Sequence, residues 1–204
     1  MDVMGLRRRI MMASKKAKAI VIWNNLEDGY MTSTYWQDRN TSDTLTTFAN
    51  GIATTQFLSS TGSYKTMMSK VGVSTYKDHK YYCRMQCKIN KDIRPYMTGM
   101  DAADIQWFTE TAEVNEWGAY SNIVTGRADR TSWTYCPEFS TLSANSGLIA
   151  ETKNVLVVDL TLMFGAGNEP ATTADFEALC ALNGVDLNTP QSKDVSGTEL
   201  MWII

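Results

Sequence analysis

Histidine is almost absent from this sequence of 204 residues, which contains only His79. Histidine is the residue most often used for general acid–base catalysis and is a common zinc ligand, so its scarcity argues against both functions. His79 precedes Lys80 in a turn-like segment and has the pattern of a solvated loop residue. No G-x-S-x-G, H-E-x-x-H, P-loop or paired-carboxylate motif is present. The sequence therefore predicts a protein that is not an enzyme and has no catalytic residue.

Cysteine is scarce as well. The four thiols, Cys83, Cys87, Cys136 and Cys180, are too few for a disulfide scaffold in a chain of this length. Cys83 and Cys87 lack the C-x2-C pairs or histidine partners that a zinc site needs. We expect free thiols that pack in the core as small hydrophobes, a reducing compartment, and neither a metal site nor a cofactor.

One group of carboxylates leaves an alternative to this metal-free prediction. Runs of this kind are usually solvated loops, but oxygen ligands are also what calcium binds. The group comprises Asp101, Asp104, Glu110, Glu113 and Glu116. Calcium therefore stays open as a cofactor.

Long apolar runs are missing. No run reaches the roughly 18 residues that would suggest a membrane span. The apolar stretch from Ile10 to Ala13 is shorter than the roughly 7 residues that a secretory signal requires. The sequence predicts no membrane span and no Sec-dependent export.

Positive charge is concentrated at the N-terminus. Residues 1–20 hold six bases against one acid, a net charge of +5, whereas the remainder holds 13 bases and 21 acids, a net charge of −8. A basic arm suits docking onto an acidic partner, whereas an acidic body argues against direct nucleic-acid binding. The candidate docking residues are Arg7, Arg8, Arg9, Lys15, Lys16 and Lys18.

The residues that are present follow the pattern of an all-β protein. From Tyr81 to Asn90 the side chains alternate, so that one face is expected to hold Cys83, Met85, Cys87 and Ile89 and the other Tyr82, Arg84, Gln86 and Lys88. This alternation predicts a half-buried strand of an antiparallel sheet.

Turn signals divide the rest of the chain into short strands. Asn50-Gly51 predicts a hairpin between Thr44 to Ala49 and Ile52 to Leu58. Ala19 to Trp23 reads as a first strand, and between residues 91 and 150 turns recur about every 8 to 12 residues, including at Trp117-Gly118 and Cys136-Pro137. Such spacing predicts a β-sandwich or barrel.

The segment from 154 to 182 has the most distinctive local sequence. The apolar run Val155 to Phe164 predicts a central strand that ends at Gly165-Ala-Gly167. A dinucleotide-binding turn would need a third glycine where Pro170 stands, so we reject that interpretation. Thr172 and Asp175 then predict a short capped helix near 172–182.

Aromatic side chains suggest a binding function. Amphipathic rings stack on sugars in many sites, although tryptophans in sandwiches more often fill the core. The glycan-binding candidates are Trp107, Trp117, Trp133 and Tyr135.

Several of these segments resemble minor structural proteins of phages and prophages of Gram-positive, gut-type bacteria. Asp159 to Pro170 is similar to a "DLT-x-MFG-x-GNEP" signature in those proteins, Asp78 to Tyr82 to a "GHKYY" segment, and Met4 to Arg9 to an "MGLRRR" start. Asp78 stands where that family has a glycine. The resemblance implies a jelly-roll domain similar to carbohydrate-binding modules.

The resemblance and the charge distribution together give the functional hypotheses. We expect a basic arm at 1–20 and a jelly-roll β-sandwich at 21–204 with its short helix near the C-terminus. The main hypothesis is a non-enzymatic virion protein of the tail, fibre or head decoration, assembled in the cytoplasm of the bacterial host. It would bind other virion proteins and form a homo-oligomer, for which a trimer is the working assumption. The alternative is a carbohydrate-binding module that recognises host surface glycan.

Overall fold

The computed structural model describes residues 21–23, 31, 33, 36–38, 43–58, 67–69, 73–93, 95–98, 106–107, 112–133, 136–139, 147–182 and 185–188. The basic arm predicted at residues 1–20, with all its candidate docking residues, lies outside the described residues, as does Tyr135.

One antiparallel six-stranded sheet dominates the fold. Its order is β10-β7-β13-β4-β3, and β1 pairs with the C-terminal half of β13. The strands are β1 (Val21–Trp23), β3 (Thr44–Ala49), β4 (Ile52–Phe57), β7 (Lys80–Ile89), β10 (Gly118–Thr125) and β13 (Ile149–Asp159). β13 is therefore the central strand.

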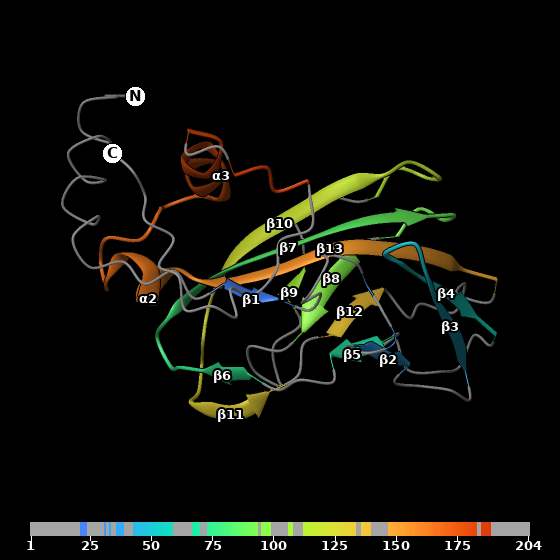
Figure 1. The fold of residues 1–204 in the computed structure, drawn as a ribbon, viewed down its shortest axis with the longest axis horizontal. Coiled ribbons are helices and arrows are strands. Elements are labelled where there is room, and N and C mark those ends of the chain that lie inside the picture. The colour runs from blue at the N-terminus through green and yellow to red at the C-terminus, as the bar shows by residue number, and fades with distance from the viewer. Residues whose placement is uncertain are drawn as a thin grey trace.

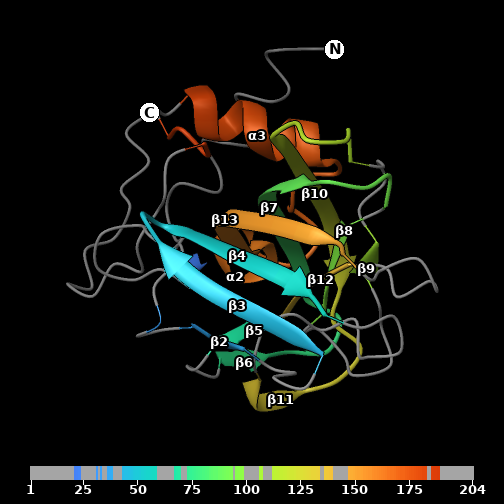
Figure 2. The ribbon, with the colours of Figure 1, turned by 90° about the vertical axis from the view of Figure 1, so that its right-hand side faces the viewer.

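Three smaller antiparallel sheets form the second layer. They are β2 (Trp36–Asp38) with β5 (Met67–Ser69), β6 (Val73–Thr75) with β11 (Arg130–Trp133), and β8 (Pro95–Thr98) between β9 (Gln106–Trp107) and β12 (Cys136–Phe139). They lie on one side of the large sheet, opposite helix α3 (Thr173–Leu182) (Figure 1), and the turned view shows the same arrangement (Figure 2). The predicted all-β jelly-roll sandwich with a short helix after its last strand is confirmed.

The predicted alternation along β7 is confirmed. Cys83, Met85, Cys87 and Ile89 are buried in the core between the layers, which also contains Trp36 of β2 and Phe139 of β12. The other face, which carries Tyr82, Arg84, Gln86 and Lys88, points away from that core, and we call it the outer face. The expected free thiols are also confirmed for Cys83, Cys87 and Cys180.

The hairpin predicted around Asn50-Gly51 is confirmed. β3 and β4 pair from Thr44↔Phe57 to Ala49↔Ile52. Asn50 and Gly51 have φ angles of 51° and 75°, as a two-residue turn with two positive φ values requires.

The strand predicted as far as Phe164 ends earlier, so this prediction is wrong at its C-terminal end. β13 stops at Asp159, and Leu160–Phe164 form helix α2. The Asp159 carboxylate accepts a 2.9 Å hydrogen bond from the backbone amide of Leu162. This cap satisfies a free amide of the first turn and starts the helix.

One predicted turn is a strand instead, and another lies slightly earlier than predicted. Cys136-Pro137 lies within β12, at the edge of its small sheet, where proline is tolerated because one side of the strand forms no ladder. Gly118 begins β10, and the turn falls slightly earlier, where Asn115 has a φ of 63°. Neither α2 nor α3, the helices of the described ranges, is long and apolar enough to cross a membrane.

Candidate functional site

A β-bulge in β13 shapes the outer face. Lys153 pairs with Gln86 and Leu156 pairs with Arg84, so two residues of β13 lie opposite the single residue Met85. Asn154, the first of the two, has a φ of 50°, a left-handed conformation that asparagine tolerates better than most residues. The bulge adds a polar side chain to the outer face, since both Val155 and Val157 pack in the core.

Helix α3 covers the part of the outer face beyond the bulge. Phe176 and Cys180 of α3 belong to one buried cluster with Tyr82, Leu156 and Val158. The helix begins as predicted, because Thr172 and Asp175 form reciprocal hydrogen bonds between side chain and backbone. The sheet before the bulge carries charged side chains, so the bulge marks the boundary between an apolar and a polar region.

Glu177 is held at this boundary. One carboxylate oxygen, Oε1, accepts hydrogen bonds from the Tyr82 hydroxyl at 2.7 Å and the Ser121 hydroxyl at 2.8 Å. Burial and then the hydrogen bond to Glu177 raise the pKa of Tyr82 above its usual range, so the hydroxyl remains a donor to Glu177 well above neutral pH. The second oxygen of Glu177 can accept hydrogen bonds from a ligand.

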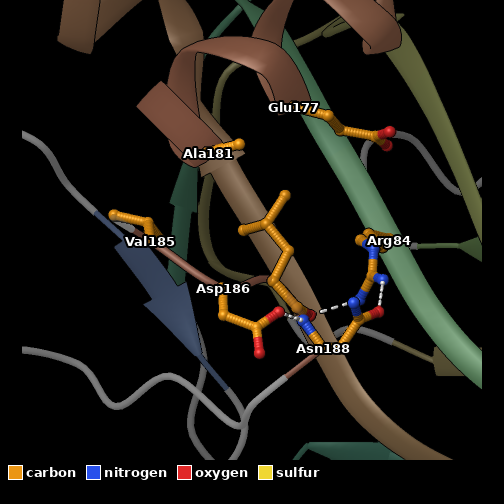
Figure 3. A pocket seen from close by; sticks show the side chains of 7 residues that line it. Arg84, Glu177, Ala181, Val185, Asp186 and Asn188 are labelled. Carbon is orange, nitrogen blue, oxygen red and sulfur yellow. Dashed lines mark hydrogen bonds between the residues drawn. The ribbon is translucent and has the colours of Figure 1, made fainter. Parts of the chain in front are cut away.

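The residues after α3 complete a cavity. The Val185 amide donates to the Cys180 carbonyl at 2.9 Å and directs residues 185–188 across the sheet. Arg84, only 5% exposed, donates to the Leu187 carbonyl at 2.5 Å and to the Asn188 side-chain oxygen at 2.6 Å. The resulting cavity of about 410 Å³ is lined by Arg84, Glu177, Ala181, Val185, Asp186, Leu187 and Asn188 (Figure 3).

Three amide side chains join the bulge to this cavity. The Asn154 amide nitrogen donates to the Gln86 side-chain oxygen and, at 2.6 Å, to the Asn188 backbone carbonyl. Gln86 in turn donates to the Asn188 side-chain oxygen at 3.2 Å. Residues 185–188 are thus held by side chains of both central strands.

Trp117 lies at the far end of the same polar region. It precedes β10 and is 36% exposed. The Lys153 ammonium lies 4.1 Å from the ring centroid and that of Lys88 5.8 Å, while Lys88 also pairs with Glu151 at 2.5 Å. From Arg84 to Lys88, β7 rises roughly 14 Å, given about 3.4 Å per residue.

These groups suit an uncharged, hydroxyl-rich ligand. The lining combines the N–H groups of Arg84 and Asn188 with the carboxylates of Glu177 and Asp186, and one Asp186 oxygen accepts a 2.9 Å hydrogen bond from the Asn188 backbone amide. Ala181, Val185 and Leu187 add apolar surface. Each hydroxyl can both donate and accept, so a polyol satisfies such a mixed lining.

Two other predicted glycan-binding candidates lie in strands of the second layer. The backbone places Trp107 in β9 and Trp133 in β11, which belong to two different small sheets. The roles assigned to these aromatic residues stay predictions.

His79 is not a solvated loop residue, so this prediction is wrong. Its Nδ1 lies 2.9 Å from a carboxylate oxygen of Asp159, which is 1% exposed, and its ring packs near Tyr76 and Tyr81. The turn before β7 is confirmed, and Asp78 has a φ of 63°. Glycine adopts such a positive φ without strain, whereas aspartate does so at a steric cost.

The segment from Asp159 to Pro170 forms a polar network that His79 and Lys80 join from the start of β7. Glu169, with a side chain 4% exposed, accepts hydrogen bonds from the Thr161 hydroxyl at 2.7 Å and the Gly167 amide at 2.9 Å. Burial alone would raise the pKa of Glu169, but these hydrogen bonds and nearby Lys80 lower it. These contacts give the signature a structural role.

The calcium alternative gains no support from the part of the chain that the structure describes. Glu113 and Glu116 are exposed, and the other three carboxylates of the group fall outside the described ranges. No group of three or more metal-ligating side chains occurs among the described residues.

The sequence did not single out Asn154, Glu177 or Asn188, and it treated Arg84 only as part of a polar face. Two features of the sequence could have pointed to the site. One is an arginine on the same strand face as Tyr82, and the other is an asparagine directly before the apolar run of β13.

No protein-family model and no curated protein matches this chain. Among solved structures, an arabinose-bound GH51 α-L-arabinofuranosidase matches with a TM-score of 0.53 and 10% identity, over 83% of this chain and 30% of that chain. A mutant of a family 29 carbohydrate binding module matches with a TM-score of 0.44 and 13% identity, over 68% and 90%. The CBM22-1 and GH10 modules of a Clostridium thermocellum xylanase complexed with xylohexaose match with a TM-score of 0.46 and 13% identity, over 70% and 29%. At these identities the arabinofuranosidase shows a similar fold and no more.

Proposed function

We propose that this chain is a carbohydrate-binding protein whose ligand occupies the cavity between α3, residues 185–188 and β7. The observation that carries the proposal is the mixed lining of that cavity, which contains the buried guanidinium of Arg84, the carboxylates of Glu177 and Asp186, and apolar side chains. The volume of about 410 Å³ falls in the range of roughly 300–1,000 Å³ that is usual for small-molecule sites.

The remaining outer face extends the site toward a longer ligand. Arg84, Gln86 and Lys88 form one row of outer-face side chains along β7. Trp117 lies next to Lys88, at the end of this row away from the cavity. A short oligosaccharide placed along this row would have one sugar in the cavity and another beside the indole ring. Binding of this kind requires no catalytic group.

A glycan array with the purified chain tests the proposal, followed by calorimetric titration of any ligand found. Asn188→Asp keeps the oxygen that faces Arg84 but removes the amide donor, and Glu177→Gln removes the charged acceptor. We expect each to weaken binding about tenfold, the effect of losing a hydrogen bond to a buried group. Thr47→Ala, an exposed change in β3, is the control. An array on which the wild-type chain binds no glycan would overturn the proposal.

A second proposal concerns where the domain works. We infer from the resemblance of Asp159 to Pro170 and of Met4 to Arg9 to phage proteins that it is displayed on a virion. In that setting the basic segment at residues 1–20 docks onto other virion proteins, and the sugar site meets the host surface. Immunogold labelling of purified particles tests this location, and deletion of residues 1–20 tests docking. Unlabelled particles, or full incorporation of the truncated chain, would contradict it.

A further inference from the structure

Asn154 does not line the cavity, yet it contacts two groups that shape it. Its side chain is 6% exposed and lies between β7 and residues 185–188. Both of its described hydrogen bonds are donated by the same amide nitrogen, one to Gln86 and one to the Asn188 carbonyl. Without the extra residue of the bulge, β13 would have no side chain on the outer face between Lys153 and Leu156.

These contacts determine how the Asn188 amide is oriented. Arginine has no acceptor, so the Asn188 atom that faces Arg84 must be its side-chain oxygen. Gln86 donates to the same oxygen, and the Asn154 amide holds the Gln86 oxygen so that the Gln86 amide nitrogen faces Asn188. The Asn188 amide nitrogen is then the group left to donate to a ligand.

We propose that Asn154 is a positioning residue, which holds residues 185–188 against the sheet and fixes Asn188 as a hydrogen-bond donor at the cavity. This inference rests on the proposed carbohydrate site and deepens it, because the ligand must present an acceptor oxygen where Asn188 donates. Asn154 acts through Gln86 and Asn188 and does not touch the ligand.

The test uses two substitutions of Asn154 and one matched control. Asn154→Gly keeps the left-handed backbone accessible and removes the amide. Asn154→Asp keeps the shape but replaces the donor with a carboxylate that repels both acceptors. Asn50→Gly makes the same change at an asparagine of nearly equal φ, 51° against 50°, in the β3–β4 turn.

Two measurements on each full-length variant separate positioning from general stability. Hydrogen exchange at residues 185–188 should become at least about tenfold faster in both Asn154 variants and stay unchanged in Asn50→Gly. The dissociation constant of the glycan found on the array should rise about tenfold at a temperature where circular dichroism shows each variant fully folded.

The outcomes distinguish this inference from the proposed function. Unchanged exchange at residues 185–188 in both Asn154 variants overturns the positioning role, whether or not glycan binds. Faster exchange with a dissociation constant within about twofold of wild type overturns the link to binding. Faster exchange in a protein whose wild type binds no glycan supports the hold on residues 185–188 and shows that the proposed function is wrong.

Discussion

The hydroxyl of Tyr82 donates a 2.7 Å hydrogen bond to Glu177 and thereby joins β7 to α3 at the edge of the cavity. The Tyr82 ring also packs on Phe176, with ring centroids 4.6 Å apart. One tyrosine therefore both docks the helix and orients a carboxylate of the proposed site.

Tyr82→Phe should reduce the free energy of unfolding by about 1.5–3 kcal/mol, because it removes a hydrogen bond to a charged group but keeps the ring. Urea unfolding measures this loss. Tyr76→Phe, at a side chain that is 41% exposed, should cost far less. Equal losses in the two variants would show that the bond to Glu177 contributes little.

Glu169→Gln should change the pH dependence of stability. The folded pKa of Glu169 is lowered, so its contribution is present above the unfolded value of about 4.3 and disappears as the pH falls through the folded pKa. We expect the variant to be less stable by about 1–2 kcal/mol at pH 7 and to approach wild type as the pH falls through the lowered pKa of Glu169. Glu113→Gln, at an exposed carboxylate, is the control. A difference that does not vary with pH would contradict the expectation.

Asp159→Ala should lower the free energy of unfolding by roughly 2 kcal/mol, since it removes the cap of α2 and the partner of His79. A double-mutant cycle with His79→Ala separates the two contributions. Strictly additive effects would show that the contact between His79 and Asp159 adds no stability.

Trp117→Ala should weaken glycan binding about tenfold while changing the melting temperature little, because the ring lies at the border of the sheet and is partly exposed. Leu45→Ala, at a side chain 53% exposed in β3, should leave binding unchanged. A glycan that binds both variants as tightly as wild type does not contact Trp117.

Cys83, Cys87 and Cys180 should resist thiol reagents in the folded protein, because all three side chains are buried. Burial raises the pKa of Cys83 and Cys180 to about 12 and raises that of Cys87 as well, so these thiols stay protonated near pH 8 and inaccessible. A colourimetric thiol assay should detect at most Cys136 in the native chain and all four cysteines after unfolding. Rapid reaction of two or more thiols in the native state would contradict the structure.

The sequence was most informative where the structural signal is local. The alternation along β7, the Asn50-Gly51 turn and the Thr172 cap each depend on residues within a few positions of one another, and all three were predicted correctly. The strand predicted through Phe164 failed because the Asp159 cap outweighed an apolar run that suits a strand or a buried helix equally.

The cavity could not be predicted in the same way. Arg84 and Asn188 are 104 positions apart, and Gln86 and Asn154 are 68 apart. Their contacts depend on the register of β7 with β13 and on the bulge, which shifts that register by one residue. The residue pattern of one short segment does not show which residues of two distant strands pair.

The position of the network around Glu169, away from the cavity, has a consequence for how chains with this motif are compared. Asp159, Thr161 and Glu169 bind groups near the strand–helix junction, whereas the proposed ligand contacts come from residues 84–88, 117, 177 and 185–188. A sequence search with this motif would therefore find chains that share the fold at this junction. Their ligands need not be the same, because the motif does not include the proposed ligand contacts. Sorting such chains by specificity would require comparing the positions that correspond to Arg84, Asn154 and Asn188.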